Sequence, residues 1–205
     1  MSRYATDSGG GGGFKPEFGI HNVICCQLVD MGTTDKEWEG KVIGKVNKIN
    51  FGFEFVDVTK ESEKGSYHPL WGQQFTNSLG KKANLRKLLD GWRGQAFTPE
   101  ELKKFNLGNL LGLSCQLVIQ PNGKGNPKIA SIVKSSEKLV GERELHEFWV
   151  EEGCFDEDLP EWMPEWMAGD IKQCDECATG FGAKEAAYAP SEPLPNEVDD
   201  DDIPF

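Results

Sequence analysis

The chain of 205 residues has few histidines and lacks the short motifs that usually mark catalytic sites. His21, His68 and His146 stand far apart and belong to no pattern for a general base or a metal. No Gly-rich phosphate-binding motif is present, because PNGKGNPK at residues 121–128 fits a hairpin turn. The carboxylates show no spacing typical of a two-metal site. We therefore expect that the protein is not an enzyme and uses no cofactor.

The chain also lacks a long hydrophobic run and a secretion signal. No stretch approaches the roughly 18 consecutive apolar residues of a membrane helix. Residues 1–17 contain a glycine run and no apolar segment, so we expect a flexible arm rather than a signal peptide. These absences predict a soluble, cytoplasmic protein.

Six cysteines without an export signal indicate thiols rather than a disulfide framework. Cys174 and Cys177 form the one C-x-x-C pair, and zinc would need two more ligands, for which Cys154 and His146 are the nearest candidates. Because no second close pair exists, we prefer free thiols, with a metal at Cys154, Cys174 and Cys177 as the alternative.

The net charge of −12 is divided unevenly along the chain. Residues 15–140 carry 18 Lys and Arg against 13 Asp and Glu, a net charge of +5. Residues 141–205 carry 3 against 20, a net charge of −17. A mildly basic body joined to a strongly acidic extension suggests a nucleic-acid interaction, with an acidic tail that competes with it or recruits another molecule.

The first third of the chain has the pattern of strands. Residues 20–30, IHNVICCQLVD, are rich in apolar residues and end at MGTTDKEWEG, whose Gly and Thr indicate a loop. Residues 41–58, KVIGKVNKINFGFEFVDV, alternate with β-branched and aromatic residues and predict a long, twisted strand. Residues 67–79, YHPLWGQQFTNSL, predict a shorter third strand, irregular or at an edge because of its Pro and Gly.

The middle of the chain changes to a helical pattern. KKANLRKLLDGWRG at residues 81–94 has apolar residues at helical spacing and glycines near its end. FTPEELKKF then has the signals of a helix start, with Thr98 as N-cap, Pro99 in the first turn and Glu101 closing a capping box.

The strand pattern then returns as a hairpin. Residues 114–120, SCQLVIQ, and residues 127–134, PKIASIVK, flank the turn dipeptide Asn122-Gly123. Three strands, a helical insert and a two-strand hairpin follow the order of the OB-fold, a small Greek-key barrel. We therefore predict a mainly β protein with a five-stranded OB-fold barrel over residues 18–140 and a helical insert between strands 3 and 4.

The acidic half divides into two parts. Residues 141–178 hold many aromatic residues and the repeat EWMPEWM, so we expect this acidic aromatic extension to pack on the barrel or on another subunit. Residues 179–205 are rich in Gly, Ala, Pro and acidic residues, which predicts a disordered linker and an acidic tip.

A barrel with interleaved aromatic and basic residues favours binding of single strands, because bases stack on rings and phosphates follow a cationic groove. The candidate stacking residues are Phe53, Phe55, Trp71, Phe75 and Trp92. The candidate phosphate partners are Lys45, Lys48, Lys81, Lys82, Arg86, Lys87, Arg93, Lys124 and Lys128. Each has a structural alternative, since alternating Phe residues and a Trp at helical spacing are typical of a core, and lysines of a solvated helix face.

Two stretches resemble known families. The end of the chain, DDDDIPF, resembles the acidic tip of bacterial single-stranded-DNA-binding proteins (SSB). KKANLRKLLDGWRGQAFTPEELKKFNLGNLLGLSCQLVI resembles the bacteriophage family of single-stranded-DNA-binding proteins, in which a comparable run lies inside an OB-fold. The first resemblance implies that the tip docks on genome-maintenance enzymes, through Asp199, Asp200, Asp201, Asp202, Ile203, Pro204 and Phe205.

Both resemblances imply a non-sequence-specific single-stranded-DNA-binding protein of phage or prophage replication, recombination and repair. Its partners would be single-stranded DNA and the enzymes that the tip recruits, in the cytoplasm of a bacterial host if the protein is phage-encoded. One alternative is a single-strand annealing or recombination-mediator protein, which a strand-annealing assay would distinguish. The other is an acidic DNA mimic, which the basic charge of residues 15–140 disfavours.

Overall fold

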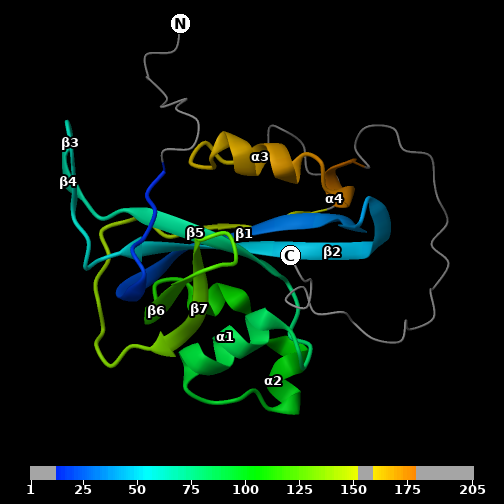
Figure 1. Ribbon diagram of the computed structural model, residues 1–205, viewed down its shortest axis with the longest axis horizontal. Coiled ribbons are helices and arrows are strands. Elements are labelled where there is room, and N and C mark those ends of the chain that lie inside the picture. The colour runs from blue at the N-terminus through cyan, green and yellow to red at the C-terminus, as the bar shows by residue number, and fades with distance from the viewer. Residues whose placement is uncertain (1–12, 152–158, 179–205) are drawn as a thin grey trace, which may run out of the picture.

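The computed structural model describes residues 13–151 and 159–178, and six of their strands form one large, mainly antiparallel sheet (Figure 1). The long strands are β1 (Gly19–Trp38), β2 (Lys41–Phe55), β5 (Leu70–Thr76), β6 (Ser114–Pro121) and β7 (Pro127–Lys134). The short strands are β3 (Lys60–Ser62), β4 (Gly65–Tyr67) and β8 (His146–Phe148). The helices are α1 (Asn84–Arg93), α2 (Pro99–Lys104), the 3-10 helix η1 (Leu107–Leu110), α3 (Glu165–Ile171) and α4 (Asp175–Ala178).

The sheet has the strand order β5-β2-β1-β6-β7, and β8 pairs with β1 off this path. Helices α1 and α2 lie on one side of the sheet and α3 and α4 on the other (Figure 1). A mainly β protein is therefore confirmed. In the part of the chain that the structure describes, no strand ladder joins β5 to β7, so a closed barrel stays a prediction. One bond links these end strands, as the Ile129 N–H donates to Gln73 Oε1 at 2.8 Å.

Strand β1 is longer than the sequence pattern predicts. The expected loop MGTTDKEWEG continues as strand to Trp38 and pairs with the first half of β2. The reversal lies at Glu39 and Gly40, both with positive φ, whereas Gly32 (φ 71°) falls in a register shift between Asp30 and Thr33. The glycine taken as a loop signal therefore belongs to a β-bulge.

A second hairpin was not predicted. Strands β3 and β4 pair with each other in a separate two-stranded sheet between β2 and β5. Tyr67, which the sequence pattern places at the start of the third strand, is the last residue of β4. Pro69 separates it from β5, which is an end strand of the sheet, as expected from its Pro and Gly.

Both predicted helices of the insert are present. The buried side of α1 carries Leu85, Leu88, Leu89 and Trp92, and Gly94 (φ 70°) ends the helix in the left-handed conformation. In α2 the Thr98 side chain accepts from Glu101 N–H while the Glu101 side chain accepts from Thr98 N–H, so the capping box is confirmed.

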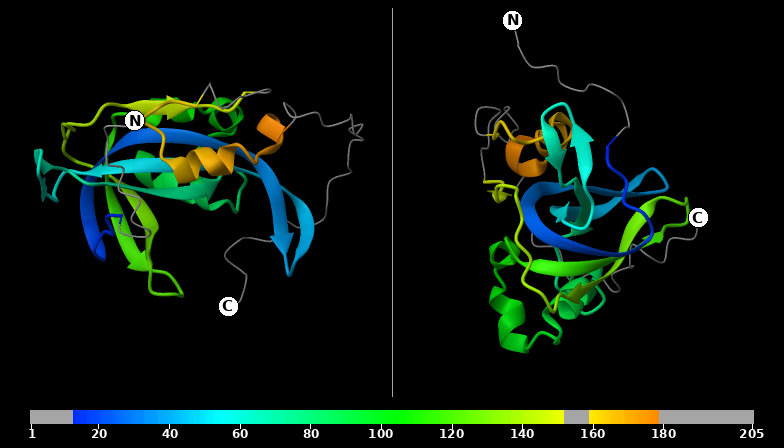
Figure 2. Two further views of the ribbon diagram at one scale, coloured as in Figure 1. Left: turned by 90° about the horizontal axis from the view of Figure 1, so that it is seen from above. Right: turned by 90° about the vertical axis from the view of Figure 1, so that its left-hand side faces the viewer.

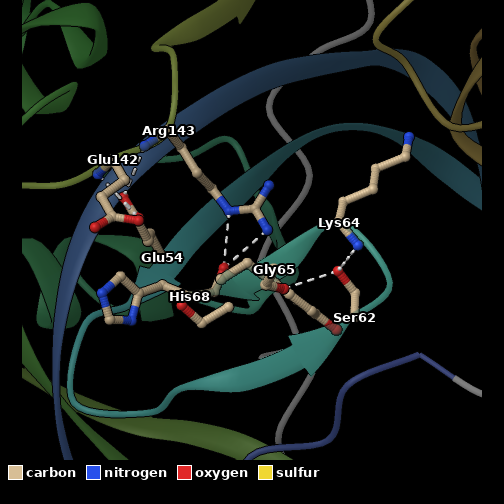
Figure 3. A pocket seen from close by; sticks show the side chains of 9 residues that line it. Glu54, Ser62, Lys64, Gly65, His68, Glu142 and Arg143 are labelled. Atoms are coloured by element: carbon tan, nitrogen blue, oxygen red, sulfur yellow. Dashed lines mark hydrogen bonds between the residues drawn. The ribbon is translucent and has the colours of Figure 1, made fainter.

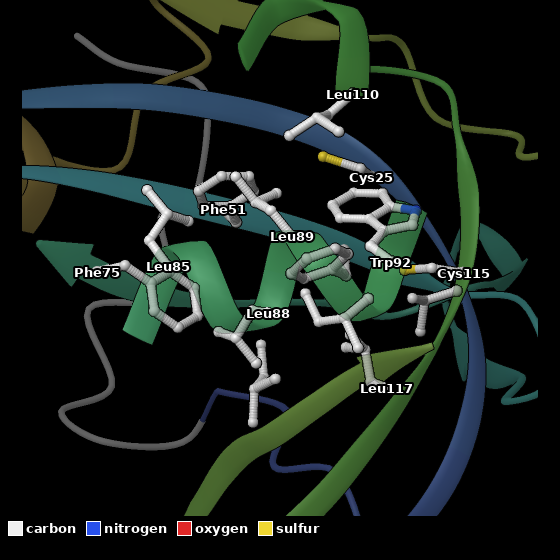
Figure 4. Close-up of a cluster of buried hydrophobic side chains, with 14 of the residues drawn as sticks. Cys25, Phe51, Phe75, Leu85, Leu88, Leu89, Trp92, Leu110, Cys115 and Leu117 are labelled. Carbon is white, nitrogen blue, oxygen red and sulfur yellow. The ribbon is translucent and has the colours of Figure 1, made fainter. Parts of the chain in front are cut away.

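The main core lies between α1 and the inner face of the sheet (Figure 4). Phe51 and Phe53 on β2 meet Phe75 on β5 and Trp92 on α1, with Phe51 and Phe75 edge to face at a centroid distance of 5.6 Å. Gly91 allows a close approach here, because a Cβ at this position would collide with the Ile132 carbonyl oxygen on β7. Helix α1 thus packs directly against the β7 backbone.

The acidic aromatic extension lies against β1. Strand β8 pairs in parallel with Gln27–Val29, and α3 and α4 cover the outer side of β1. A second cluster joins Val29 and Met31 of β1 to buried residues of the extension, namely Met163, Met167, Ile171, Cys174 and Cys177. No helix among the described residues is long and apolar enough to span a membrane.

Candidate nucleic-acid interface

Four of the five candidate stacking rings lie in the core. Phe53 and Phe55 are fully buried, and Phe75 and Trp92 are 7% and 4% exposed. Each ring packs against another aromatic ring, and the Trp92 indole N–H also donates to Ser114 O at 3.4 Å. A buried ring offers no face to a base, so the structure assigns these four to packing.

Trp71 has a different position. It lies at the start of β5, half-buried, and meets Phe55 edge to face at a centroid distance of 6.3 Å. Phe14 and His21 pack on the same Phe55 ring at 5.2 Å. We call Phe14, His21, Phe55 and Trp71 the end cluster, because they gather where β2 ends and β5 begins. Trp71, Phe14 and His21 are half-buried, whereas Phe55 is fully buried.

Two of the candidate cations, Lys45 and Arg93, pair with carboxylates within the protein. Lys45 Nζ lies 2.6 Å from Asp35 and 2.9 Å from Asp175, and these hydrogen bonds, that to Asp35 first, raise the pKa of its ammonium group. The Arg93 guanidinium pairs with Glu101 and lies over the Phe97 ring at 4.2 Å. Both charges are balanced by carboxylates, so we remove Lys45 and Arg93 from the phosphate partners.

The remaining candidate cations fall into two groups. Lys81, Lys82 and Lys87 are exposed on and before α1, where half-buried Arg86 donates to Leu79 O at 3.5 Å. Lys124 and Lys128 are exposed on the β6–β7 hairpin. Lys48 stands apart, half-buried on β2 opposite Thr76.

Strand β7 of the β6–β7 hairpin contacts β5, the strand that carries Trp71. The bond between Gln73 and Ile129 brings β7 beside β5, so Lys128 neighbours the strand that carries Trp71. The β1–β2 and β6–β7 hairpins bend toward the same side of the molecule (Figure 2, left). Trp71 and Lys128 thus belong to the two end strands that this bond links, whereas Lys81, Lys82 and Lys87 belong to α1 and the segment before it, and α1 packs on β7 (Figure 1).

Sequence patterns did not single out several residues near this region. Phe14 precedes the first strand, and Lys60 Nζ lies 5.9 Å from its ring centroid. Lys64 and Tyr67 belong to the unpredicted β3–β4 hairpin, and Arg143 reaches the same hairpin from beyond β7. The Lys-Gly turn of the hairpin, KESEKGSY at residues 60–67, was the one local signal for it.

The alternative metal site has no support among the described residues, which contain no cluster of three or more His, Cys, Asp or Glu side chains able to hold a metal. Cys174 and Cys177 are buried thiols, and burial raises the pKa of the Cys174 thiol. The His146 ring stacks on Trp162 at 4.5 Å. Cys154 lies outside the described residues, as do Asp199 to Asp202, Ile203, Pro204 and Phe205 of the tip.

No family model matches this chain, and comparison with curated proteins and with solved structures finds no match either.

Proposed function

We propose that this protein binds single-stranded DNA without sequence specificity, on an OB-fold whose end cluster and β6–β7 hairpin contact the strand. One observation carries the proposal: the strand order β5-β2-β1-β6-β7, with α1 between the third and fourth long strands along the chain. The OB-fold has five strands in this connectivity and binds oligonucleotides on a face flanked by its hairpin loops. The Gln73–Ile129 bond is consistent with a barrel open at one seam.

The distribution of charge supports the same function. Helices α3 and α4 of the acidic aromatic extension cover the β1 side opposite α1 (Figure 1), so the carboxylates of these two helices lie across the sheet from the α1 lysines. Its Asp175 carboxylate is held by Lys45 and its Glu176 carboxylate by the Thr33 hydroxyl and N–H. A cationic surface that is kept clear of the acidic extension can follow a phosphate backbone.

The tip gives this binding protein a second role. In our proposal, Ile203, Pro204 and Phe205 dock in an apolar pocket of a replication, recombination or repair enzyme. The carboxylates of Asp199–Asp202 steer the approach to a cationic rim of that pocket. The resemblance of DDDDIPF to the bacterial tip supports this part of the proposal.

Titration with poly-dT tests the function directly. The chain has six tryptophans, and stacking of bases on Trp71 should quench part of their fluorescence. The logarithm of the binding constant should fall linearly with the logarithm of salt concentration, because phosphate contacts release counterions. No response to poly-dT at low salt would refute the proposal.

Replacing Trp71 with leucine is expected to weaken poly-dT binding by about 5–150-fold, the effect of losing roughly 1–3 kcal/mol of base stacking. The matched control is Trp166→Leu, because Trp166 is 54% exposed and lies on α3, on the far side of the sheet (Figure 1). The control should bind like the wild type. Equal affinities of all three proteins in a fluorescence anisotropy assay would exclude Trp71 as a stacking residue.

Deleting Asp199–Phe205 is expected to tighten poly-dT binding several-fold at low salt and to abolish recruitment of partner enzymes. The physical reason is charge, because the −17 of residues 141–205 competes with DNA for the +5 of residues 15–140. The difference should vanish at high salt. Unchanged affinity at low salt would refute the hypothesis that the tail competes with DNA, but it would not refute DNA binding.

A further inference from the structure

A cavity of about 370 Å³ lies between the β3–β4 hairpin and the segment that follows β7 (Figure 3). Its lining includes Lys64, Tyr67 and His68 from the hairpin side and Glu142 and Arg143 from the segment. Glu54 of β2 also lines it and is 1% exposed. None of these residues belongs to the candidate set that the sequence singled out.

The segment is fixed in place by the Glu54 carboxylate, which accepts the N–H groups of Glu142 at 3.0 Å and Arg143 at 3.4 Å. The charge of Glu54 is therefore satisfied by backbone donors below the cavity. The Arg143 guanidinium donates to the His68 carbonyl oxygen through Nε at 3.2 Å and Nη2 at 2.9 Å (Figure 3). Two bonds to one oxygen fix the orientation of the guanidinium before any ligand arrives.

Arg143 retains donors for a ligand. A guanidinium has five N–H groups, and within the described residues those of Arg143 make only the two bonds to His68. The hairpin opposite is itself ordered, since Ser62 Oγ donates to Gly65 O at 2.9 Å and accepts from Lys64 N–H at 3.2 Å. The Glu142 side chain points away from the Arg143 guanidinium (Figure 3).

The cavity is lined by two cationic side chains, Arg143 and Lys64, and by the aromatic ring of Tyr67. Tyr67 is 42% exposed at the end of β4, and Lys64 lies in the turn of the same hairpin. Planar guanidinium donors suit a phosphate, and an exposed ring suits a base. We propose that the cavity is a subsite for one nucleotide of the bound single strand, with Tyr67 stacking on the base and Arg143 and Lys64 holding the phosphate.

The subsite is joined to the end cluster through the chain. The β3–β4 hairpin connects Phe55 at the end of β2 to Trp71 at the start of β5, and Lys60 of β3 reaches over Phe14. Tyr67 and Trp71 are four residues apart, about 13 Å of extended chain. This separation is within the footprint of roughly 4–16 nucleotides that one OB-fold covers. The inference rests on the proposed function and extends the path of the bound DNA strand beyond Trp71.

The test measures fluorescence anisotropy with oligothymidylates of increasing length. Tyr67→Ala should weaken binding of long oligothymidylates by about 5–150-fold and leave short ones, which fit on the end cluster alone, nearly unaffected. Tyr67→Phe keeps the ring and should restore the affinity. Lys64→Gln should reduce the slope of the salt dependence by about 0.7, as expected for one lost phosphate contact on a single strand. Thymidine monophosphate alone should bind only weakly.

The outcomes separate this inference from the proposed function. If Tyr67→Ala binds every length like the wild type while Trp71→Leu is weakened, the subsite is refuted and DNA binding stands. If Tyr67→Phe fails as Tyr67→Ala does, the ring does not act by stacking, and the subsite is likewise refuted. Thymidine monophosphate as tight as the long strand would indicate a mononucleotide site instead. A wild type that binds no oligothymidylate overturns both proposals.

Discussion

Replacing Trp92 with alanine is expected to lower the free energy of unfolding by about 3–5 kcal/mol, the usual cost of deleting a large aromatic ring from a core. Trp92 is 4% exposed and lies between α1 and β2, where its ring packs at 5.9 Å from Phe53. Its indole N–H also donates to Ser114 O, so the substitution removes a hydrogen bond as well as packing. Urea unfolding followed by circular dichroism measures the change.

Trp166→Ala is the control for this prediction. Trp166 is 54% exposed, so its loss should change the free energy of unfolding by no more than about 0.5 kcal/mol, as for most surface substitutions. A Trp92→Ala protein as stable as the control would mean that α1 does not pack on the sheet as described. The prediction also distinguishes Trp92 from Trp71, whose replacement should weaken DNA binding with a smaller effect on stability.

Replacing Gly32 with valine is expected to detach the acidic aromatic extension from β1. Gly32 lies in the β1 bulge at φ 71°, and a Cβ at this position would collide with the side chain of Cys174. Helix α4 would have to move, which would also break the bonds from Thr33 to Glu176. We expect about 1–3 kcal/mol from overpacking in addition to the strain of the left-handed backbone. Hydrogen exchange of residues 159–178 should rise.

Gly40→Val is a matched control, because Gly40 has nearly the same φ of 74° and a Cβ at this position would meet no atom within 4 Å among the described residues. Both substitutions strain the backbone, but only the Gly32→Val side chain would collide with the acidic aromatic extension. Equal exchange of residues 159–178 in the two variants would show that Gly32 does not determine the docking.

Local signals in the sequence predicted the helical insert well. The Thr98 capping box and the apolar spacing of α1 each depend on a few neighbouring residues, and both are present. The β6–β7 hairpin is present too, but its loop spans residues 122–126, and Gly125 rather than Gly123 has the positive φ. The length of β1 was underestimated for a local reason too, because Gly32 looks the same in a bulge as in a loop. Only the pairing of β1 with β2 shows that Gly32 lies in a bulge and not in a loop.

The candidate site was harder to predict, because it depends on contacts between distant parts of the chain. Alternation places Phe51, Phe53 and Phe55 on one face of β2 but does not say whether that face is inside. Lys45 pairs with Asp35 on the neighbouring strand and also with Asp175, which is 130 residues away. Arg143 is positioned by Glu54 and His68, which are 89 and 75 residues away. No local pattern contains this information.

The parallel strand β8 has a consequence for how copies of this protein can associate. The side of β1 that does not face β2 is paired with β6 over Gly19–Ile24 and with β8 over Gln27–Val29. An unpaired strand edge is a template for another chain, and covering it prevents strand addition there. The acidic aromatic extension thus closes this stretch of β1 to a neighbouring molecule. Neighbouring copies of the protein would have to meet through side chains here, and not by merging their sheets.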